Sequence, residues 1–184
     1  MIALVFFMFS CLVALACGVM AAVSDVKTLK IPNMYPVMVL GAFVVGYGAS
    51  FAFGYHEMVF SPWKEHLISG GVLFLGGFIL FATGAYGAGD SKLIAAFGFW
   101  FGFKALVCFI FYTSLIGALV AVFTMFVKRS KPFKDPKSVW LKRVQEEGAR
   151  DVPYGVAIAI GAVITFVYSG FFSEEVLVNF VSAG

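Results

Sequence analysis

Charged residues are scarce in this chain of 184 residues. Lysine and arginine together number 13 and aspartate and glutamate only 10, so that 12% of the chain is charged, about half the share found in soluble domains. Hydrophobic residues make up 61%, and the mean hydropathy is +0.97. Because so few polar side chains cannot cover a folded surface in water, the composition excludes a soluble globular protein and indicates that lipid is the solvent.

Cysteine and histidine are also few, and they form no motif. Cys11, Cys17 and Cys108 fall in apolar stretches without a CxxC pair, which argues for small packing residues. His56 and His66 lie ten residues apart without a carboxylate framework, and we interpret them as solvated. We therefore expect no metal site and no cofactor. The net charge of +3 is explained as a membrane-sorting signal, so no nucleic-acid partner is expected.

Six apolar stretches predict an all-α membrane protein, a polytopic bundle of about six transmembrane helices. They run approximately over Ile2–Val23, Met34–Phe53, Leu67–Ala85, Lys92–Phe103, Ala105–Val127 and Pro153–Phe172. The fourth stretch is too short to cross a bilayer unless it borrows residues from its neighbours. The whole chain, residues 1–184, is expected to be one integral-membrane domain with no soluble module.

The basic residues predict the orientation. One side of the predicted bundle carries most of them, namely Lys27, Lys30, Lys92, Lys128, Arg129, Lys131, Lys134, Lys137, Lys142, Arg143 and Arg150. The other side has only Lys64 and Lys104. Because lysine and arginine stay in the cytoplasm, we expect a multi-pass protein of the cytoplasmic (inner) membrane with both termini outside.

The longest basic loop, residues 128–152, has two interpretations. Asp135 and Pro136 suit the start of a helix and Gly148 its end, while Trp140 and Val144 would share one face among basic residues. This pattern is typical of a helix lying in the membrane interface. The alternative is a solvated tether whose charges only anchor the topology.

Two aspartates, Asp25 and Asp90, lie at the ends of apolar stretches on the side predicted to be cytoplasmic. Carboxylates at such positions are costly and normally have a function, although one of them alone is more often a helix cap. Two that can meet provide the minimum for aspartic-protease chemistry: the ionised one draws a proton from water and the protonated one polarises the scissile carbonyl. Helix dipoles predict that Asp90 is the ionised base and Asp25 the protonated acid.

Nearby residues are candidates for substrate binding. Gly87 and Gly89 would let the backbone unwind and an extended peptide approach, unless they only serve helix packing. Lys92 would bias the aspartate pair or steer a substrate carboxylate, unless it is only a topological anchor. Tyr154 and Gly155 would line a substrate groove, with helix packing as the alternative.

Three runs of this sequence resemble the motif blocks of the prepilin peptidases, the GxGD-type intramembrane aspartic proteases. The runs are Asp25 with the following basic residues and Ile31-Pro32-Asn33, then Gly87-Ala88-Gly89-Asp90-Ser91-Lys92-Leu93, and then Val152-Pro153-Tyr154-Gly155-Val156-Ala157. The resemblance implies that Asp25 and Asp90 are catalytic. It also implies that the enzyme cleaves the short basic leader from type IV prepilin-like or pseudopilin precursors at the cytoplasmic face of the membrane.

One departure from the family pattern is informative. Larger bacterial members carry an N-terminal cytoplasmic domain with paired CxxC motifs, which is associated with N-methylation of the trimmed pilin. We expect no such methyltransferase or zinc domain here. The chain resembles the short, peptidase-only branch, which serves Flp-type pili of tight-adherence systems or acts as archaeal preflagellin peptidase.

Two other classes of protein remain as alternatives. A transporter or channel would use Asp25 and Asp90 as ion or proton relays, although a conduction path normally has its polar groups near the midplane. A non-catalytic scaffold of a secretion machine would explain the topology but leave the aspartates unexplained. The oligomeric state is left open.

Overall fold

The computed structural model describes residues 2–84, 86–130, 132, 138–145, 152–174 and 176–178. The regular elements in that part of the chain are all helices, which confirms the predicted all-α class. They are α1 (Ile2–Thr28), α2 (Met34–Ala52), α3 (His56–Val59), α4 (Trp63–Ala82), α5 (Ala88–Gly98), α6 (Phe103–Ser130), α7 (Val139–Gln145) and α8 (Tyr154–Tyr168).

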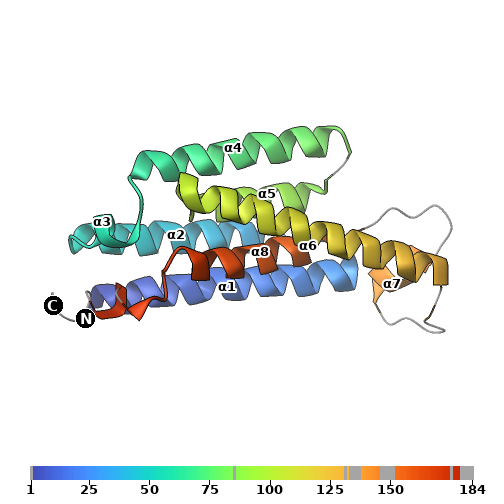
Figure 1. Cartoon of the computed structure of the whole chain (residues 1–184), viewed down its shortest axis with the longest axis horizontal. Helices are drawn as coiled ribbons and strands as arrows, with labels where there is room; N and C mark the ends of the chain where they lie inside the picture. The colour runs from blue at the N-terminus through green and yellow to red at the C-terminus, as the bar shows by residue number, and fades with distance from the viewer. Residues whose placement is uncertain are drawn as a thin grey trace.

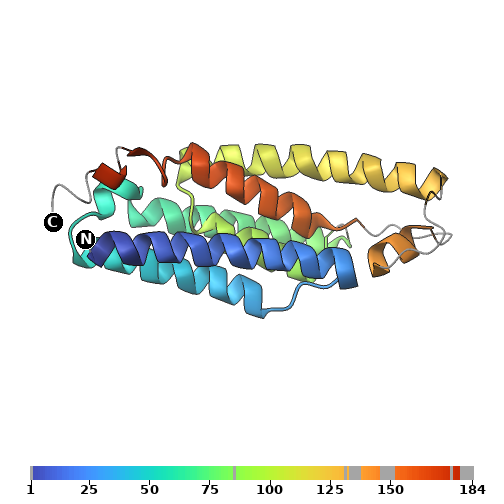
Figure 2. The same cartoon turned by 90° about the horizontal axis from the view of Figure 1, so that it is seen from below.

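The long helices run side by side along one axis and form an elongated bundle (Figures 1 and 2). Helix α1 packs against α2 and α8, and α8 packs in turn against α6. Helix α5 lies inside the bundle, in contact with α2, α4 and α8. The end of α1, the start of α5 and the start of α8 all lie toward the end that carries α7 (Figure 1), which we call the α7 end. The opposite end, with α3, is the α3 end.

Among the described residues, four helical segments are long and apolar enough to cross a membrane, which supports a multi-pass membrane protein. They are Ile2–Thr28, Met34–Ala52, Trp63–Ala82 and Ala105–Ser130. Helix α8 has 15 residues and α5 has 11, which at the rise of an α-helix gives about 22 and 16 Å, less than the hydrocarbon core of about 30 Å. Each of the six predicted stretches thus contains a helix, but crossing by α5 and α8 stays a prediction.

Several helix boundaries differ from the predicted ones. Helix α1 continues to Thr28, so Asp25 lies in its last turn. Helix α5 begins at Ala88, before the predicted start at Lys92, and it therefore contains Asp90. Polar residues at these positions extend the helices because their backbone hydrogen bonds continue beyond the apolar run, which a pattern of hydrophobicity alone does not register.

Helix α7 corresponds to part of the helix predicted in the long basic loop. Trp140 and Val144 share a face as expected, but this face packs against Val127 of α6 and, beside it, Val26 and Leu29 at the end of α1. The apolar side of α7 is thus buried against protein. The predicted boundary residues 135, 136 and 148 lie outside the described part of the chain.

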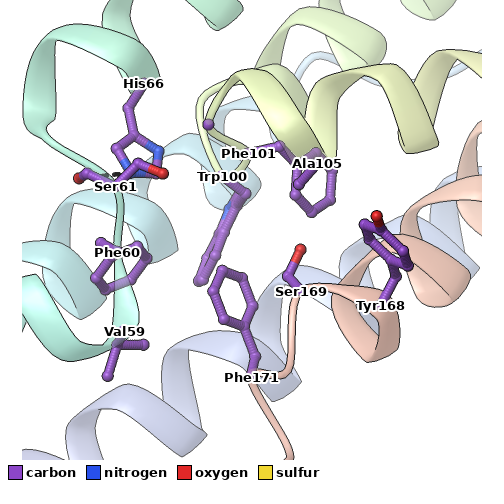
Figure 3. Close-up of a pocket in the computed structure, with 11 residues that line it drawn as sticks. Val59, Phe60, Ser61, His66, Trp100, Phe101, Ala105, Tyr168, Ser169 and Phe171 are labelled. Atoms are coloured by element: carbon purple, nitrogen blue, oxygen red, sulfur yellow. Dashed lines mark hydrogen bonds between the residues drawn. The ribbon is translucent and has the colours of Figure 1, made fainter.

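The interpretation of His66 as solvated was wrong. Its side chain is 2% exposed, and its ring nitrogens lie 2.9 Å from the carbonyl oxygen of Phe99 and 3.1 Å from that of Ser61. Buried carbonyl groups need donors, and the imidazole ring stands between these two turns. The ring borders a cavity of about 290 Å³ at the α3 end, whose lining includes the aromatic side chains of Phe60, Trp100, Phe101, Tyr168 and Phe171 (Figure 3).

Glycines allow α4 and α5 to pack closely, as small residues do between membrane helices. A Cβ atom at Gly70 would lie 2.5 Å from the ring of Phe99, whereas one at the adjacent Gly71 would meet nothing within 4 Å. We expect Gly70→Ala to destabilise the protein by about 1–3 kcal/mol through overpacking. Gly71→Ala should be neutral or slightly stabilising because alanine favours helix. Melting temperatures in detergent test this, and equal values for the two variants would contradict the packing.

Candidate active site

A cavity of about 590 Å³ lies at the α7 end of the bundle. Its lining comes from two segments far apart in the sequence, the end of α1 with its connection to α2 and the start of α5. The lining residues are Asp25, Leu29, Lys30, Ile31, Pro32, Asn33, Gly87, Ala88, Gly89, Asp90 and Lys92. The structure therefore places the two aspartates from different helices in one cavity, with Gly87, Gly89 and Lys92 beside them.

Asp25 is held by a hydrogen bond from α8. The side chain is 5% exposed, and its Oδ2 accepts a hydrogen bond of 2.9 Å from the backbone N–H of Gly155. Gly155 is the second residue of α8, where N–H groups have no partner within the helix. Both an N–H donor and the positive end of a helix dipole stabilise the charged form of a carboxylate. This contact therefore favours the charged form of Asp25, against the burial of its side chain, which disfavours that form.

Hydrogen bonds fix the turn that follows Asp25. The N–H of Leu29 donates to the carbonyl oxygen of Asp25 (2.7 Å), and the hydroxyl of Ser24 donates to the carbonyl oxygen of Lys30 (2.9 Å). Leu29 has a φ of 54°, a left-handed conformation that is uncommon for a residue with a side chain. Strained backbone of this kind occurs mainly at functional sites. Here it turns the chain so that residues 30–33 form a wall of the cavity.

Asp90 is the third residue of α5 and lies in a less favourable place for a charge. Its Oδ1 is buried and has no hydrogen-bond partner within the described residues. Burial raises the pKa of Asp90 to about 7, and the charge of Asp25 contributes in the same direction, while the backbone N–H groups of Gly87 and of Asp90 itself oppose the shift. At neutral pH Asp90 thus carries a proton far more readily than an ordinary aspartate.

These contacts favour the reverse of the proton assignment that helix dipoles predict. The sequence places Asp90 at a helix start, which favours its charged form, but the structure directs a second helix start, that of α8, at Asp25. Asp90 instead has one carboxyl oxygen without a partner. The donor reaches Asp25 only because α8 packs against α1 in the folded protein. The positions of Asp25 and Asp90 within their own helices could not reveal this contact.

Both glycines before Asp90 lie in close contact with other parts of the site. A Cβ atom at Gly87 would lie 2.6 Å from Oδ2 of Asp90, and one at Gly89 would lie 2.8 Å from Cβ of Ile31. Gly87 is extended, with φ −72° and ψ 150°, whereas Gly89 belongs to α5. The backbone is therefore non-helical at Gly87, and Gly89 lets the first turn of α5 approach the connection between α1 and α2.

Lys92 is tied to the opposite wall of the cavity. Its Nζ donates a hydrogen bond of 2.9 Å to Oδ1 of Asn33, the residue that precedes α2. This bond links α5 to the connection between α1 and α2, which forms the opposite wall of the cavity. It also places a positive charge in the same cavity as the two aspartates.

Tyr154 and Gly155 do not line the cavity, although the sequence indicates them as candidates for a substrate groove. Gly155 contacts Asp25 from behind, and the ring of Tyr154 stacks on that of Tyr86, with centroids 4.7 Å apart and an interplanar angle of 29°. Tyr86 was not among the residues that the sequence indicated as candidates. It lies just before Gly87, but no spacing rule pairs it with Tyr154 on a distant helix.

Carboxyl groups and an amide oxygen line the cavity, but a metal would need a denser set of ligands. Within the described part of the chain, no three side chains of histidine, cysteine, aspartate or glutamate gather closely enough to hold an ion. What the cavity does contain is a pair of carboxyls with unlike surroundings. Such a pair is suited to combined acid and base chemistry.

Fold and site together define a helical, multi-pass membrane protein with two aspartates in a cavity at one end of its bundle. The chain belongs to the type IV leader peptidase family, whose model matches residues 11–122. This match includes both aspartates of the cavity but ends before α8 begins. The resemblance that the sequence motifs indicate is therefore confirmed at the level of the family.

Two curated relatives extend this result. The chain is 27% identical over 169 residues to a prepilin leader peptidase/N-methyltransferase of Bacillus subtilis (strain 168), which covers 88% of this chain and 56% of the relative. It is 31% identical over 93 residues to a protein of the same description from Pectobacterium carotovorum subsp. carotovorum, covering 50% of this chain and 28% of the relative. The chain thus spans about half the length, or less, of these relatives. No solved structure matches it.

Proposed function

We propose that this protein is a membrane-embedded aspartic endopeptidase that cleaves the short basic leader from type IV prepilin-like precursors, with Flp-type precursors as the preferred class. The single observation that carries the proposal is the shared cavity of Asp25 and Asp90 in a member of the type IV leader peptidase family. The likeness to prepilin leader peptidase/N-methyltransferases supports the same substrate class. Gly87, Gly89 and Lys92, which line the cavity, are proposed to border the bound peptide.

The unlike surroundings of the aspartates suggest their roles. Ionised Asp25, bonded to the N–H of Gly155, accepts a proton from the attacking water. Protonated Asp90 donates a hydrogen bond to the scissile carbonyl oxygen and stabilises the charge that develops on it. The proton balance closes when the proton taken up by Asp25 passes to the leaving amine, and the pair titrates as one coupled system.

The proposed orientation places the α7 end in the cytoplasm. Within the described residues this end carries Lys27, Lys30, Lys92, Lys128, Arg129, Lys142 and Arg143. Lysine and arginine mark the cytoplasmic side of membrane proteins, so the cavity would face the cytoplasm of an inner membrane and the α3 end would lie outside. The α7 end is also where a precursor anchored by a hydrophobic segment could present its leader.

Incubation of the purified protein in liposomes with prepilin precursors tests the proposal. A shortened product, absent with Asp25→Asn and Asp90→Asn, supports the peptidase. Ion flux without cleavage would support the transporter alternative, and neither activity would favour the scaffold. Precursors of Flp-type and of ordinary type IV pilins, compared at equal concentration, test the narrower substrate class. Equal cleavage of the two would contradict the preference for Flp-type precursors.

The cleavage rate should fall as the pH rises through about 7. The pKa of Asp90 is raised to about 7, so the acid form is present below that pH and is lost above it. If Asp90 is the proton donor, kcat decreases on the alkaline side by about tenfold per pH unit. A profile of kcat between pH 5 and 9 measures this. A rate that rises steadily through this interval would instead support Asp90 as the base.

A further inference from the structure

The first turn of α8 contacts the segments that carry both aspartates. The N–H of Gly155 donates to Oδ2 of Asp25 at 2.9 Å. The ring of the preceding residue, Tyr154, stacks on Tyr86, with centroids 4.7 Å apart. Tyr86 lies in the connection between α4 and α5, four residues before Asp90. Two successive residues of α8 thus each hold one of the two aspartate-bearing segments.

We propose that Tyr154 and Gly155 form a positioning element that sets the geometry of Asp25 relative to Asp90. The inference rests on the proposed function, because it assigns both residues to the same aspartate pair. Neither residue lines the cavity, so neither is a catalytic residue. Their role is to hold the carboxyls where they can act on one scissile bond, which depends on distances of about 3 Å.

Gly155 permits the contact with Asp25 because it has no side chain. A Cβ atom at Gly155 would lie 3.0 Å from Oδ2 and 3.1 Å from Cβ of Asp25, and 3.1 Å from Cδ1 of Ile31. The start of α8 therefore reaches the carboxylate only through glycine. Because Ile31 belongs to the cavity wall, the same contact also fixes the wall next to Asp25.

Tyr154 is itself held from two sides. Its ring stacks on that of Tyr86. It also lies close to α6, because a Cβ atom at Gly117 of that helix would be 3.4 Å from Cε1 of Tyr154. Burial, together with the charges of Tyr154 and Asp90, raises the pKa of Tyr86 to about 12. Tyr86 is therefore close enough to Asp90 to interact with it electrostatically, while its ring stacks on Tyr154.

The charged groups around the pair come from the other elements of the cavity. Lys30 follows α1 and Lys92 belongs to α5, and both line the cavity with Asp25 and Asp90. Lys92 is bonded to Asn33. None of these groups belongs to α8, so a change at Tyr154 alters the pair by geometry and leaves the set of neighbouring charges as it was.

The kinetics of two substitutions at Tyr154 test the inference. Tyr154→Phe keeps an aromatic ring on Tyr86, and we expect kcat to stay within about twofold. Tyr154→Leu removes the stack, and we expect kcat to fall by about tenfold or more with little change in KM, because displacement of a catalytic group slows the chemical step. Tyr86→Leu breaks the same stack from the other side and should have the same effect. Tyr168→Leu, at the exposed far end of α8, is the matched control.

A higher KM with unchanged kcat in Tyr154→Leu would overturn the inference, because it would indicate direct contact with substrate. Equal kcat values for Tyr154→Leu and Tyr154→Phe would overturn it as well. Melting temperatures are measured in parallel, and assays run below the lowest of them, so that the kinetics report folded protein.

A second measurement does not depend on cleavage. A hydrophobic carbodiimide modifies protonated buried carboxyls, and mass spectrometry locates the label. In the unsubstituted protein we expect label at Asp90 that decreases as the pH rises through about 7, with little at Asp25. Tyr154→Leu should shift this profile and Tyr154→Phe should not. Unchanged profiles in a protein that cleaves precursors would refute the positioning role alone, whereas absent cleavage with shifted profiles would refute only the proposed peptidase function.

Discussion

Asn substitution at either Asp25 or Asp90 should reduce leader cleavage by about 10³-fold or more, because in the same step one carboxyl takes the proton from water and the other stabilises the carbonyl oxygen. The double variant should be no slower than the slower single variant, since groups that act as a unit show strongly non-additive effects. The shared cavity is the physical reason for this expectation. Single-turnover rates with a prepilin precursor in liposomes provide the measurement.

The matched control for this experiment is Glu57→Gln. Glu57 is an exposed carboxylate in α3, at the opposite end of the bundle, so its loss removes one negative charge far from the cavity. Its cleavage rate should equal that of the unsubstituted protein. If the two aspartate substitutions instead gave moderate losses that multiply in the double variant, the aspartates would act independently and the idea of a common site would have to be abandoned.

The membrane helices could be predicted from the sequence because lipid imposes a strong rule on it. An apolar segment of about twenty residues satisfies its backbone hydrogen bonds in lipid as a helix, and each of the six apolar stretches contains one. The convergence of Asp25 and Asp90 was also predictable, because helices that alternate in direction return every second connection to the same end. The order and number of the helices place both aspartates at one end of the bundle, and the pattern of apolar stretches in the sequence reveals that order.

The contacts that tune the site could not be predicted in the same way. The bond from Gly155 to Asp25 joins residues 130 positions apart, and the stack of Tyr86 on Tyr154 joins the connection between α4 and α5 to the first residue of α8. No local pattern encodes such pairs, because they depend on how α8 tilts against α1. The contact that favours the reverse proton assignment is of this kind, and helix ends along the chain do not reveal it.

A similar limit explains the different outcome for His66. A histidine in a loop between two apolar stretches is most often solvated, and nothing in its neighbours along the chain suggests otherwise. The side chain is buried because two turns, at Ser61 and at Phe99, direct carbonyl oxygens at its ring. The second turn is 33 residues away, so the demand for a donor arises only in the folded bundle.

Gly89→Ala should lower kcat for leader cleavage by about 10²-fold, the loss expected when catalytic groups are displaced by about 1 Å. The added Cβ would lie 2.8 Å from Cβ and 3.1 Å from the carbonyl oxygen of Ile31. Ile31 cannot easily retreat, because its Cδ1 is packed near Gly155. The start of α5 must therefore move away from the cavity wall and carry Asp90 with it, while Asp25 stays bonded to α8.

The control for Gly89→Ala is Gly41→Ala, which adds the same methyl group to α2, where a Cβ atom would meet nothing within 4 Å. Its kcat should remain within about twofold of that of the unsubstituted protein, because its added atom displaces no neighbour. Both variants are assayed below their melting temperatures, so that a loss in Gly89→Ala reflects misplaced carboxyls in folded protein. If Gly89→Ala cleaved as fast as Gly41→Ala, catalysis would not depend on the close contact between Gly89 and Ile31. This contact would then not be what determines the separation of the two aspartates.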